Sequence, residues 1–84
     1  MKLLKFYADW CGPCKALSAT IDRMGDKIKI PVENINIDEN LEMTQTFQVR
    51  SVPTMIVLDD NDKEVKRVVG GSLSESQLLT FLEV

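Results

Sequence analysis

Two cysteines separated by two residues, Cys11 and Cys14, most constrain what this chain can fold into and do. They are the only cysteines in the sequence, and they stand between an apolar run at residues 2–8 and a segment with helical periodicity. A Cys-x-x-Cys pair where a strand passes into a helix is typical of thiol–disulfide chemistry. A disulfide across so short a loop removes little chain entropy from the unfolded state, so a purely structural role is disfavoured.

The composition excludes several other classes of function. The chain has 84 residues, which is room for one domain over residues 1–84. It contains no histidine, so Ser/His and Cys/His catalysis are excluded, and one cysteine pair supplies only half of the roughly four ligands of a zinc site, so we expect no metal. The net charge of −3 gives no reason to expect nucleic-acid binding. No apolar stretch approaches a membrane span or a signal peptide, so we expect a cytoplasmic protein without a membrane partner.

The periodicity around the cysteines predicts different environments for the two thiols. Residues 2–8 read as a strand covered on both faces, with Lys5 as the exception. From Gly12 a helix is expected, with Pro13 in its first turn and Gly25 near its end. Its apolar stripe consists of Cys14, Leu17, Ile21, Met24 and Ile28.

This stripe places Cys14 on the buried face of the helix, whereas Cys11 precedes the helix and can be exposed. The positive end of the helix dipole favours a thiolate at Cys11. We therefore expect Cys11 to attack a substrate disulfide and Cys14, one turn away, to resolve the mixed disulfide.

The rest of the chain completes an α/β sandwich. Residues 31–38 read as an edge strand, residues 54–58 and 64–69 as a pair of strands joined by an Asp-rich turn. A short helix is expected from Asp38 or Asn40 to about Gln48, with Leu41 and Phe47 facing inward. Ser74 and Gln77 form a capping box for the last helix. The order βαβ-α-ββα predicts a four-stranded mixed sheet with three helices on its two faces.

The cysteine motif and three further segments resemble the thioredoxin family. Trp10-Cys11-Gly12-Pro13-Cys14-Lys15 is similar to the family's active-site motif. The other segments are Asn36-Ile37-Asp38-x-Asn40, Val49-Arg50-Ser51-Val52-Pro53-Thr54 and Val69-Gly70-Gly71. The resemblance covers essentially the whole chain. It implies a monomeric protein-disulfide reductase with a redox-active Cys11–Cys14 disulfide and no cofactor, which acts on protein disulfides and is reduced by an electron donor such as a thioredoxin reductase.

The resemblance also implies a substrate-docking surface. Pro53 is expected to be cis and to pack beside the cysteines, although an ordinary trans turn proline is the alternative. The backbone of Val52 is expected to pair with an extended segment of the substrate. Trp10 could instead be a plain surface aromatic. The surface implied by the family consists of Trp10, Gly12, Pro13, Val52, Pro53, Gly70 and Gly71.

The chain departs from the family pattern in its length and behind the cysteines. Thioredoxins usually have a further strand and helix before the strand that leads to the motif, so this chain resembles a minimal member with residues 31–38 at a sheet edge. Lys5 stands where the family has a buried Asp that helps to remove the proton from the resolving cysteine. Asn34 stands where a Lys usually lies near that Asp, and Tyr7 replaces a common Trp.

Two questions stay open at the level of the sequence. Lys5 could extend its ammonium to solvent, or it could lie partly buried near Cys14 and tune the cysteine pair, either as a cation or as a neutral base. For the whole chain, a glutaredoxin-like oxidoreductase that uses glutathione and a non-catalytic thioredoxin-fold subunit are the alternatives to a protein-disulfide reductase.

Overall fold

The structure, a computed structural model, describes residues 1–71 and 73–83 and contains the predicted four-stranded mixed sheet. The first strand, β1 (Lys2–Tyr7), is central and pairs in parallel with β2 (Val32–Asn36). On its other side β1 pairs antiparallel with β3 (Thr54–Leu58), which pairs antiparallel with β4 (Glu64–Val69). The strand order β2-β1-β3-β4 confirms that β2 lies at a sheet edge.

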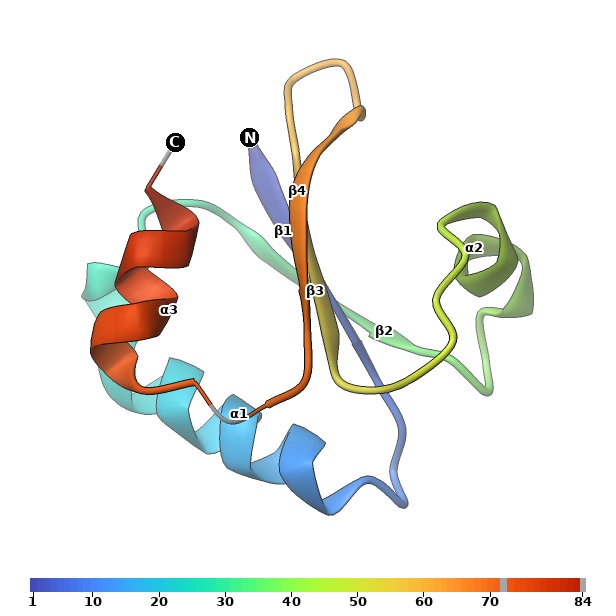
Figure 1. Cartoon of the computed structure of the whole chain (residues 1–84), viewed down its shortest axis with the longest axis horizontal. Helices are drawn as coiled ribbons and strands as arrows, with labels where there is room; N and C mark the ends of the chain where they lie inside the picture. The colour runs from blue at the N-terminus through green and yellow to red at the C-terminus, as the bar shows by residue number, and fades with distance from the viewer. Residues whose placement is uncertain (72, 84) are drawn as a thin grey trace.

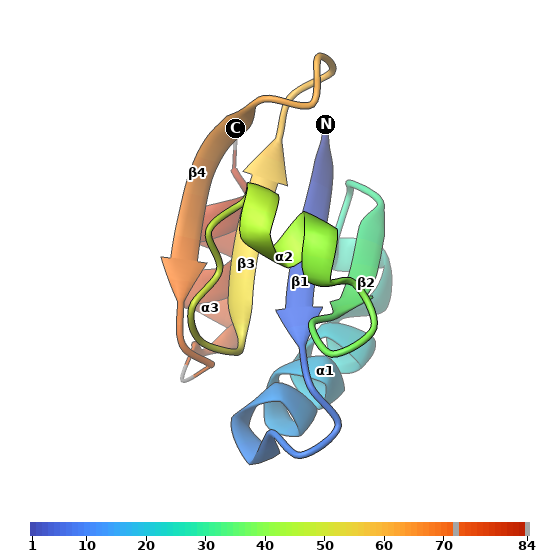
Figure 2. The same ribbon diagram turned by 90° about the vertical axis from the view of Figure 1, so that its right-hand side faces the viewer.

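Helices cover both faces of this sheet, as the sequence predicts. The helices α1 (Gly12–Met24) and α3 (Glu75–Leu82) lie on one face, and the short helix α2 (Leu41–Thr46) lies on the other (Figure 1). Figure 2 looks onto the second face, where α2 crosses in front of β1 and β3. A 3-10 turn, η1 (Gly25–Lys27), extends α1. In the described part of the chain, no helix has the length and hydropathy needed to cross a membrane.

Two hydrophobic cores result from the alternation of side chains along β1 and β3. Since both strands are interior, four consecutive residues of β1 and all five residues of β3 are buried. The core under α1 and α3 contains Leu3, Leu17, Ile21, Met24, Met55, Val57 and Leu78. The core under α2 contains Leu4, Phe6, Ile35, Ile56 and Leu58.

Helix α1 follows its predicted apolar stripe closely. Its buried residues are Cys14, Leu17, Ile21 and Met24, and Pro13 lies in its first turn. It ends at Met24 and is followed by the C-cap residue Gly25, which has a φ of 49°, a conformation that glycine adopts at little cost. The fifth residue of the stripe, Ile28, lies beyond the helix in extended conformation and still packs against the same core.

Helix α2 is shorter than predicted, and one of its expected inward residues is exposed. It ends at Thr46, and Leu41 is 63% exposed. The side chains that cover the sheet from this segment are Met43 and Phe47. The predicted side-chain cap is also absent, because Asn40 directs its amide back to the carbonyl of Asn36 instead of to the helix. The start of α2 is thereby fixed to the end of β2, with Leu41 on the outer side.

Helix α3 begins with the predicted capping box. The backbone N–H of Gln77 donates to Ser74 Oγ at 3.1 Å, and the backbone N–H of Ser74 donates to Gln77 Oε1 at 2.9 Å. Leu73 and Leu78, on either side of this cap, belong to the same core, to which Phe81 and Leu82 also contribute.

We predict that Leu78→Ala and Leu41→Ala differ sharply in their effect on stability. Leu78 is fully buried between α3 and the sheet, so its truncation should lower the free energy of unfolding by about 2–5 kcal/mol. Leu41→Ala removes an exposed side chain from a helix and should change it by less than about 0.5 kcal/mol. Urea denaturation of both variants measures the difference, and equal losses would contradict the orientation of α2.

Candidate functional site

The two cysteines lie where the chain leaves β1 and enters α1, and they form a disulfide. Their Cα atoms are 5.3 Å apart. Cys11 occupies the N-cap position of α1, and its Sγ accepts a hydrogen bond from the backbone N–H of Cys14 at 3.1 Å. A sulfur at this position lies at the positive end of the helix dipole, which favours a thiolate there. Within residues 1–71 and 73–83, no cluster of three or more His, Cys, Asp or Glu residues could hold a metal ion.

The expectation that Cys11 is the exposed cysteine is wrong for the disulfide form. Cys11 is 4% exposed and Cys14 is 2% exposed, so both are buried. The pair is enclosed because Ala8 belongs to its cluster and the side chains of Tyr7, Ile37 and Val52 pack against it. What distinguishes the two sulfurs is therefore their surroundings. Cys11 caps α1, whereas Cys14 lines a surface hollow together with Ser18 and Asp22 of the same helix.

Three loops meet beside the disulfide and form one rim. The Val52–Pro53 peptide bond is cis, as predicted. The N–H of Gly70 donates to the carbonyl of Pro53 at 2.8 Å. Gly71 lies so close that a Cβ placed on it would be 2.9 Å from Pro53 Cγ and 3.0 Å from the carbonyl oxygen of Pro13. Only glycine fits this approach without a shift, so Gly71 packs against both the start of α1 and the loop that precedes β3.

The rim presents apolar surface and a free backbone segment. Trp10 is 69% exposed and Val69 is 59% exposed. Among residues 1–71 and 73–83, neither backbone group of Val52 finds a hydrogen-bond partner. The structure thus brings Pro13, Pro53, Gly70 and Gly71 into contact, with Val52 packed against the cysteines. Gly12 lies in the exposed first turn of α1, where a Cβ would meet no atom within 4 Å.

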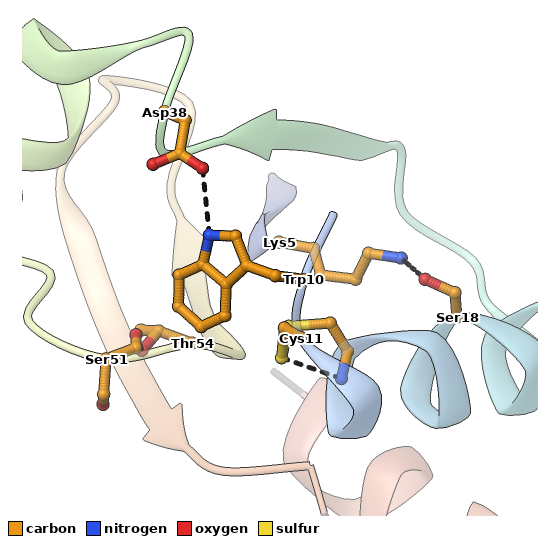
Figure 3. Close-up of a disulfide and its surroundings, with 8 residues drawn as sticks. Lys5, Trp10, Cys11, Ser18, Asp38, Ser51 and Thr54 are labelled. Carbon is orange, nitrogen blue, oxygen red and sulfur yellow. Dashed lines mark hydrogen bonds between the residues drawn. A yellow bond between two sulfur atoms is a disulfide. The ribbon is translucent and has the colours of Figure 1, made fainter. Parts of the chain in front are cut away.

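Trp10 is tethered, although its ring is exposed. Its indole N–H donates to Asp38 Oδ2 at 3.1 Å (Figure 3). Asp38 is itself held in place, because its backbone N–H donates to the side-chain oxygen of the buried Asn36 at 2.9 Å. Asn40 donates to the carbonyl of Asn36 at 3.0 Å. Asp38 therefore orients the Trp10 ring, a contact that was not predicted from the sequence, where Asp38 appeared as a possible helix cap and in a family-like segment.

Lys5 does not extend into bulk solvent. It is 6% exposed, and its ammonium donates to Ser18 Oγ on α1 (Figure 3). Burial lowers the pKa of Lys5 below the usual value of 10.5, and the negative charge of Asp22 opposes that shift. Asn34 is its register partner on β2, as the family pattern implies. Sequence reasoning missed both Ser18 and Asp22, although they follow Cys14 at intervals of four residues, the spacing of one helix face.

Comparison with known proteins gives consistent matches over the whole chain. The family model described as "Thioredoxin" matches residues 1–84. The thioredoxin of Chlamydia pneumoniae is 40% identical over 81 residues, which is 95% of this chain and 76% of that protein. The bifunctional thioredoxin reductase/thioredoxin of Mycobacterium leprae is 39% identical over 70 residues, 81% of this chain and 15% of that protein. The structure of a mutant thioredoxin from Halobacterium salinarum superimposes with a TM-score of 0.86 at 34% identity, and the match covers 96% of this chain and 70% of that one.

We predict that Gly71→Ala damages the rim while Gly12→Ala does not. The added methyl group at position 71 collides with a proline ring and a backbone carbonyl, so it should lower the free energy of unfolding by about 1–3 kcal/mol. At position 12 the same change enters open space on a helix, where alanine is favoured. Thermal denaturation of the two oxidised variants gives the comparison. A Gly71→Ala variant as stable as Gly12→Ala would refute the close approach of the three loops.

We predict a specific pH dependence for Lys5→Met. The pKa of Lys5 is lowered in the folded protein. At pH values between this lowered pKa and 10.5, the unfolded chain therefore binds more protons than the folded protein does. The free energy of unfolding of the parent protein should therefore rise relative to Lys5→Met as the pH increases through this interval. Denaturant titrations at several alkaline pH values measure the difference, with the exposed Lys29→Met as the matched control. A difference between parent and Lys5→Met that stays constant up to pH 10.5 would contradict the burial of the ammonium.

Proposed function

The chain belongs to the thioredoxin family and is a thiol–disulfide oxidoreductase, and on that premise we propose that it reduces protein disulfides with Cys11 attacking and Cys14 resolving. The observation that carries this assignment is the hydrogen bond from the Cys14 N–H to Cys11 Sγ at the start of α1. The same N–H and the helix dipole stabilise a thiolate on Cys11 once the disulfide is reduced. Cys14 lacks this donor and is the second thiol to react.

The proposed cycle transfers two electrons from the dithiol to the substrate. The Cys11 thiolate attacks one sulfur of the substrate disulfide, that disulfide breaks, and the other substrate sulfur leaves as a thiolate that takes up a proton. Cys14 then loses its proton and attacks Cys11 Sγ. The mixed disulfide breaks, the second substrate sulfur leaves as a thiolate, and the Cys11–Cys14 disulfide forms. The substrate is reduced and the protein is oxidised.

The rim beside the disulfide is the proposed docking surface. An extended substrate segment pairs with the free backbone groups of Val52, as a strand added to an edge does. Pro53, which follows Val52 directly, borders this segment. The substrate chain can approach closely because Gly12 and Gly70 carry no side chain. The side chains of Trp10 and Pro13 are the apolar walls of the surface, and Gly71 lies against Pro13 and Pro53.

An electron donor must return the disulfide to the dithiol form. We propose a thioredoxin reductase, because one of the relatives joins such a reductase and a thioredoxin in one chain. Neither this relative nor the family match favours glutathione as the donor. We further propose that residues 1–84 act as one domain, as a monomer in the cytoplasm, on protein substrates and without a nucleic-acid partner.

We predict that Cys14→Ser traps a covalent complex with a protein disulfide such as that of insulin, whereas Cys11→Ser traps none. Without the resolving thiol the mixed disulfide on Cys11 should accumulate, and it should disappear on addition of a reducing thiol. Non-reducing electrophoresis and mass spectrometry identify the adduct. Parent protein supplied with NADPH and a thioredoxin reductase should turn over, and turnover with glutathione alone would favour the glutaredoxin-like alternative. A trapped complex on Cys14 instead of Cys11 would reverse the assigned roles.

A further inference from the structure

Two neighbouring hollows beside α1 share three of their lining residues. One is lined by Cys14 together with Tyr7, Ser18 and Asp22, and the other by Lys5 with the same three residues. Ser18 and Asp22 therefore stand between the buried lysine and the second cysteine. Cys11 borders neither hollow. The contacts of the rim do not explain how Cys14 loses its proton. The residues that adjoin both Lys5 and Cys14 are therefore candidates for that role.

The hydroxyl group of Ser18 is oriented by its contact with Lys5. Its oxygen accepts from the Lys5 ammonium, so its own proton must point elsewhere. Thr20, Thr44 and Thr80 donate their hydroxyl protons to the carbonyl four residues earlier. Among the hydrogen bonds of the described residues, Ser18 makes no such bond to the Cys14 carbonyl and has no other acceptor. The Ser18 proton is therefore available for an acceptor within the hollow.

Helix geometry places that acceptor next to Ser18. Cys14 and Ser18 are four residues apart on α1, so their Cβ atoms lie roughly 5–6 Å apart on one face. Both line the same hollow. In the disulfide Cys14 carries no charge, but during the resolving step its sulfur becomes a thiolate, which accepts hydrogen bonds strongly.

We propose that Ser18 is a positioning residue for the resolving step: the Lys5 ammonium holds its oxygen, and its hydroxyl proton is donated to the Cys14 thiolate as that thiolate forms. This inference rests on the proposed role of Cys14. The proton that Cys14 loses passes to solvent through the hollow, and the electron pair left on sulfur forms the bond to Cys11. Lys5 and Ser18 thus favour deprotonation of Cys14 because they stabilise its thiolate, whereas a buried base would favour it by accepting the proton of the Cys14 thiol.

The charges around the pair are compatible with this role. From α1, Asp22 faces Lys5 and favours its charged form, and Lys15 lines the hollow beside Cys14. Asp9 precedes the motif and lines the same hollow. Tyr7 on its own strand, Asn34 on β2 and Met55 on β3 also adjoin Lys5, and none of these three is an acidic or a basic residue.

The test measures the ionisation of Cys14 directly in a Cys11→Ser background, in which Cys14 is the only thiol. The serine at position 11 can still cap α1, so the helix start is preserved. Adding Ser18→Ala should raise the pH midpoint of Cys14 ionisation by about one unit, because a hydrogen bond to the charged form is lost. Ser18→Thr retains a hydroxyl and should restore the midpoint. Thr20→Ala, which removes a hydroxyl from the same helix without touching Lys5, is the matched control.

The rate of alkylation of Cys14 as a function of pH gives the midpoint, and the ultraviolet absorbance of the thiolate checks it. A midpoint in Ser18→Ala equal to that of the Cys11→Ser parent overturns the proposal, as does a shift of the same size in Thr20→Ala. Because this readout needs no substrate, it is independent of the proposed function. If Cys14→Ser fails to trap a mixed disulfide while Ser18→Ala still shifts the midpoint, the catalytic assignment fails and the Ser18 contact stands.

Discussion

Strand β1 is hydrogen-bonded along both edges and packed on both faces, and the position of every other functional element depends on this enclosure. Its end sets the start of α1, so Cys11 becomes the N-cap and its sulfur accepts a hydrogen bond from the backbone N–H of Cys14 in the first turn. Because β1 is covered on both faces, the side chain at position 5 is buried and faces α1. A hydrophobic residue there would complete the apolar core under α1. A lysine instead needs polar partners on the helix that covers it.

Patterns that depend on local periodicity were predictable from the sequence, and contacts between distant segments were not. The stripe of α1 and the capping box of α3 follow from spacing alone, because each is determined within a few residues. Leu41 was misplaced because the bond between Asn40 and Asn36, which fixes the start of α2, leaves no trace in periodicity. The burial of Cys11 was missed because Ile37 and Val52, which cover it, come from two other loops. The partners of Lys5 required knowledge of how α1 packs on β1.

A buried lysine is a cost to the fold, and its retention at this place calls for a physical explanation. Removal of an ammonium from water is unfavourable unless hydrogen bonds and an opposite charge replace the solvent. Ser18 supplies one hydrogen bond and Asp22 the opposite charge, yet burial still dominates the pKa of Lys5. Departures from the rules of stable cores are expected at functional sites, where the chemistry compensates for the loss of stability. The position of Lys5 behind Cys14 fits that expectation better than a structural role would.

The disulfide separates two surfaces with different tasks. On one side, Pro13, Pro53 and Gly71 are packed too tightly for an extra methyl group, and the exposed ring of Trp10 is held by Asp38. These contacts fix the shape of the rim that we propose as the docking surface. On the other side, Ser18 and Asp22 line two hollows, one of which is bordered by Cys14 and the other by Lys5, and Cys11 borders neither. The proposed docking surface and the proposed stabilisation of the Cys14 thiolate therefore involve different residues, so a change of charge at Lys5 or Asp22 can alter the reactivity of Cys14 while the rim keeps its shape.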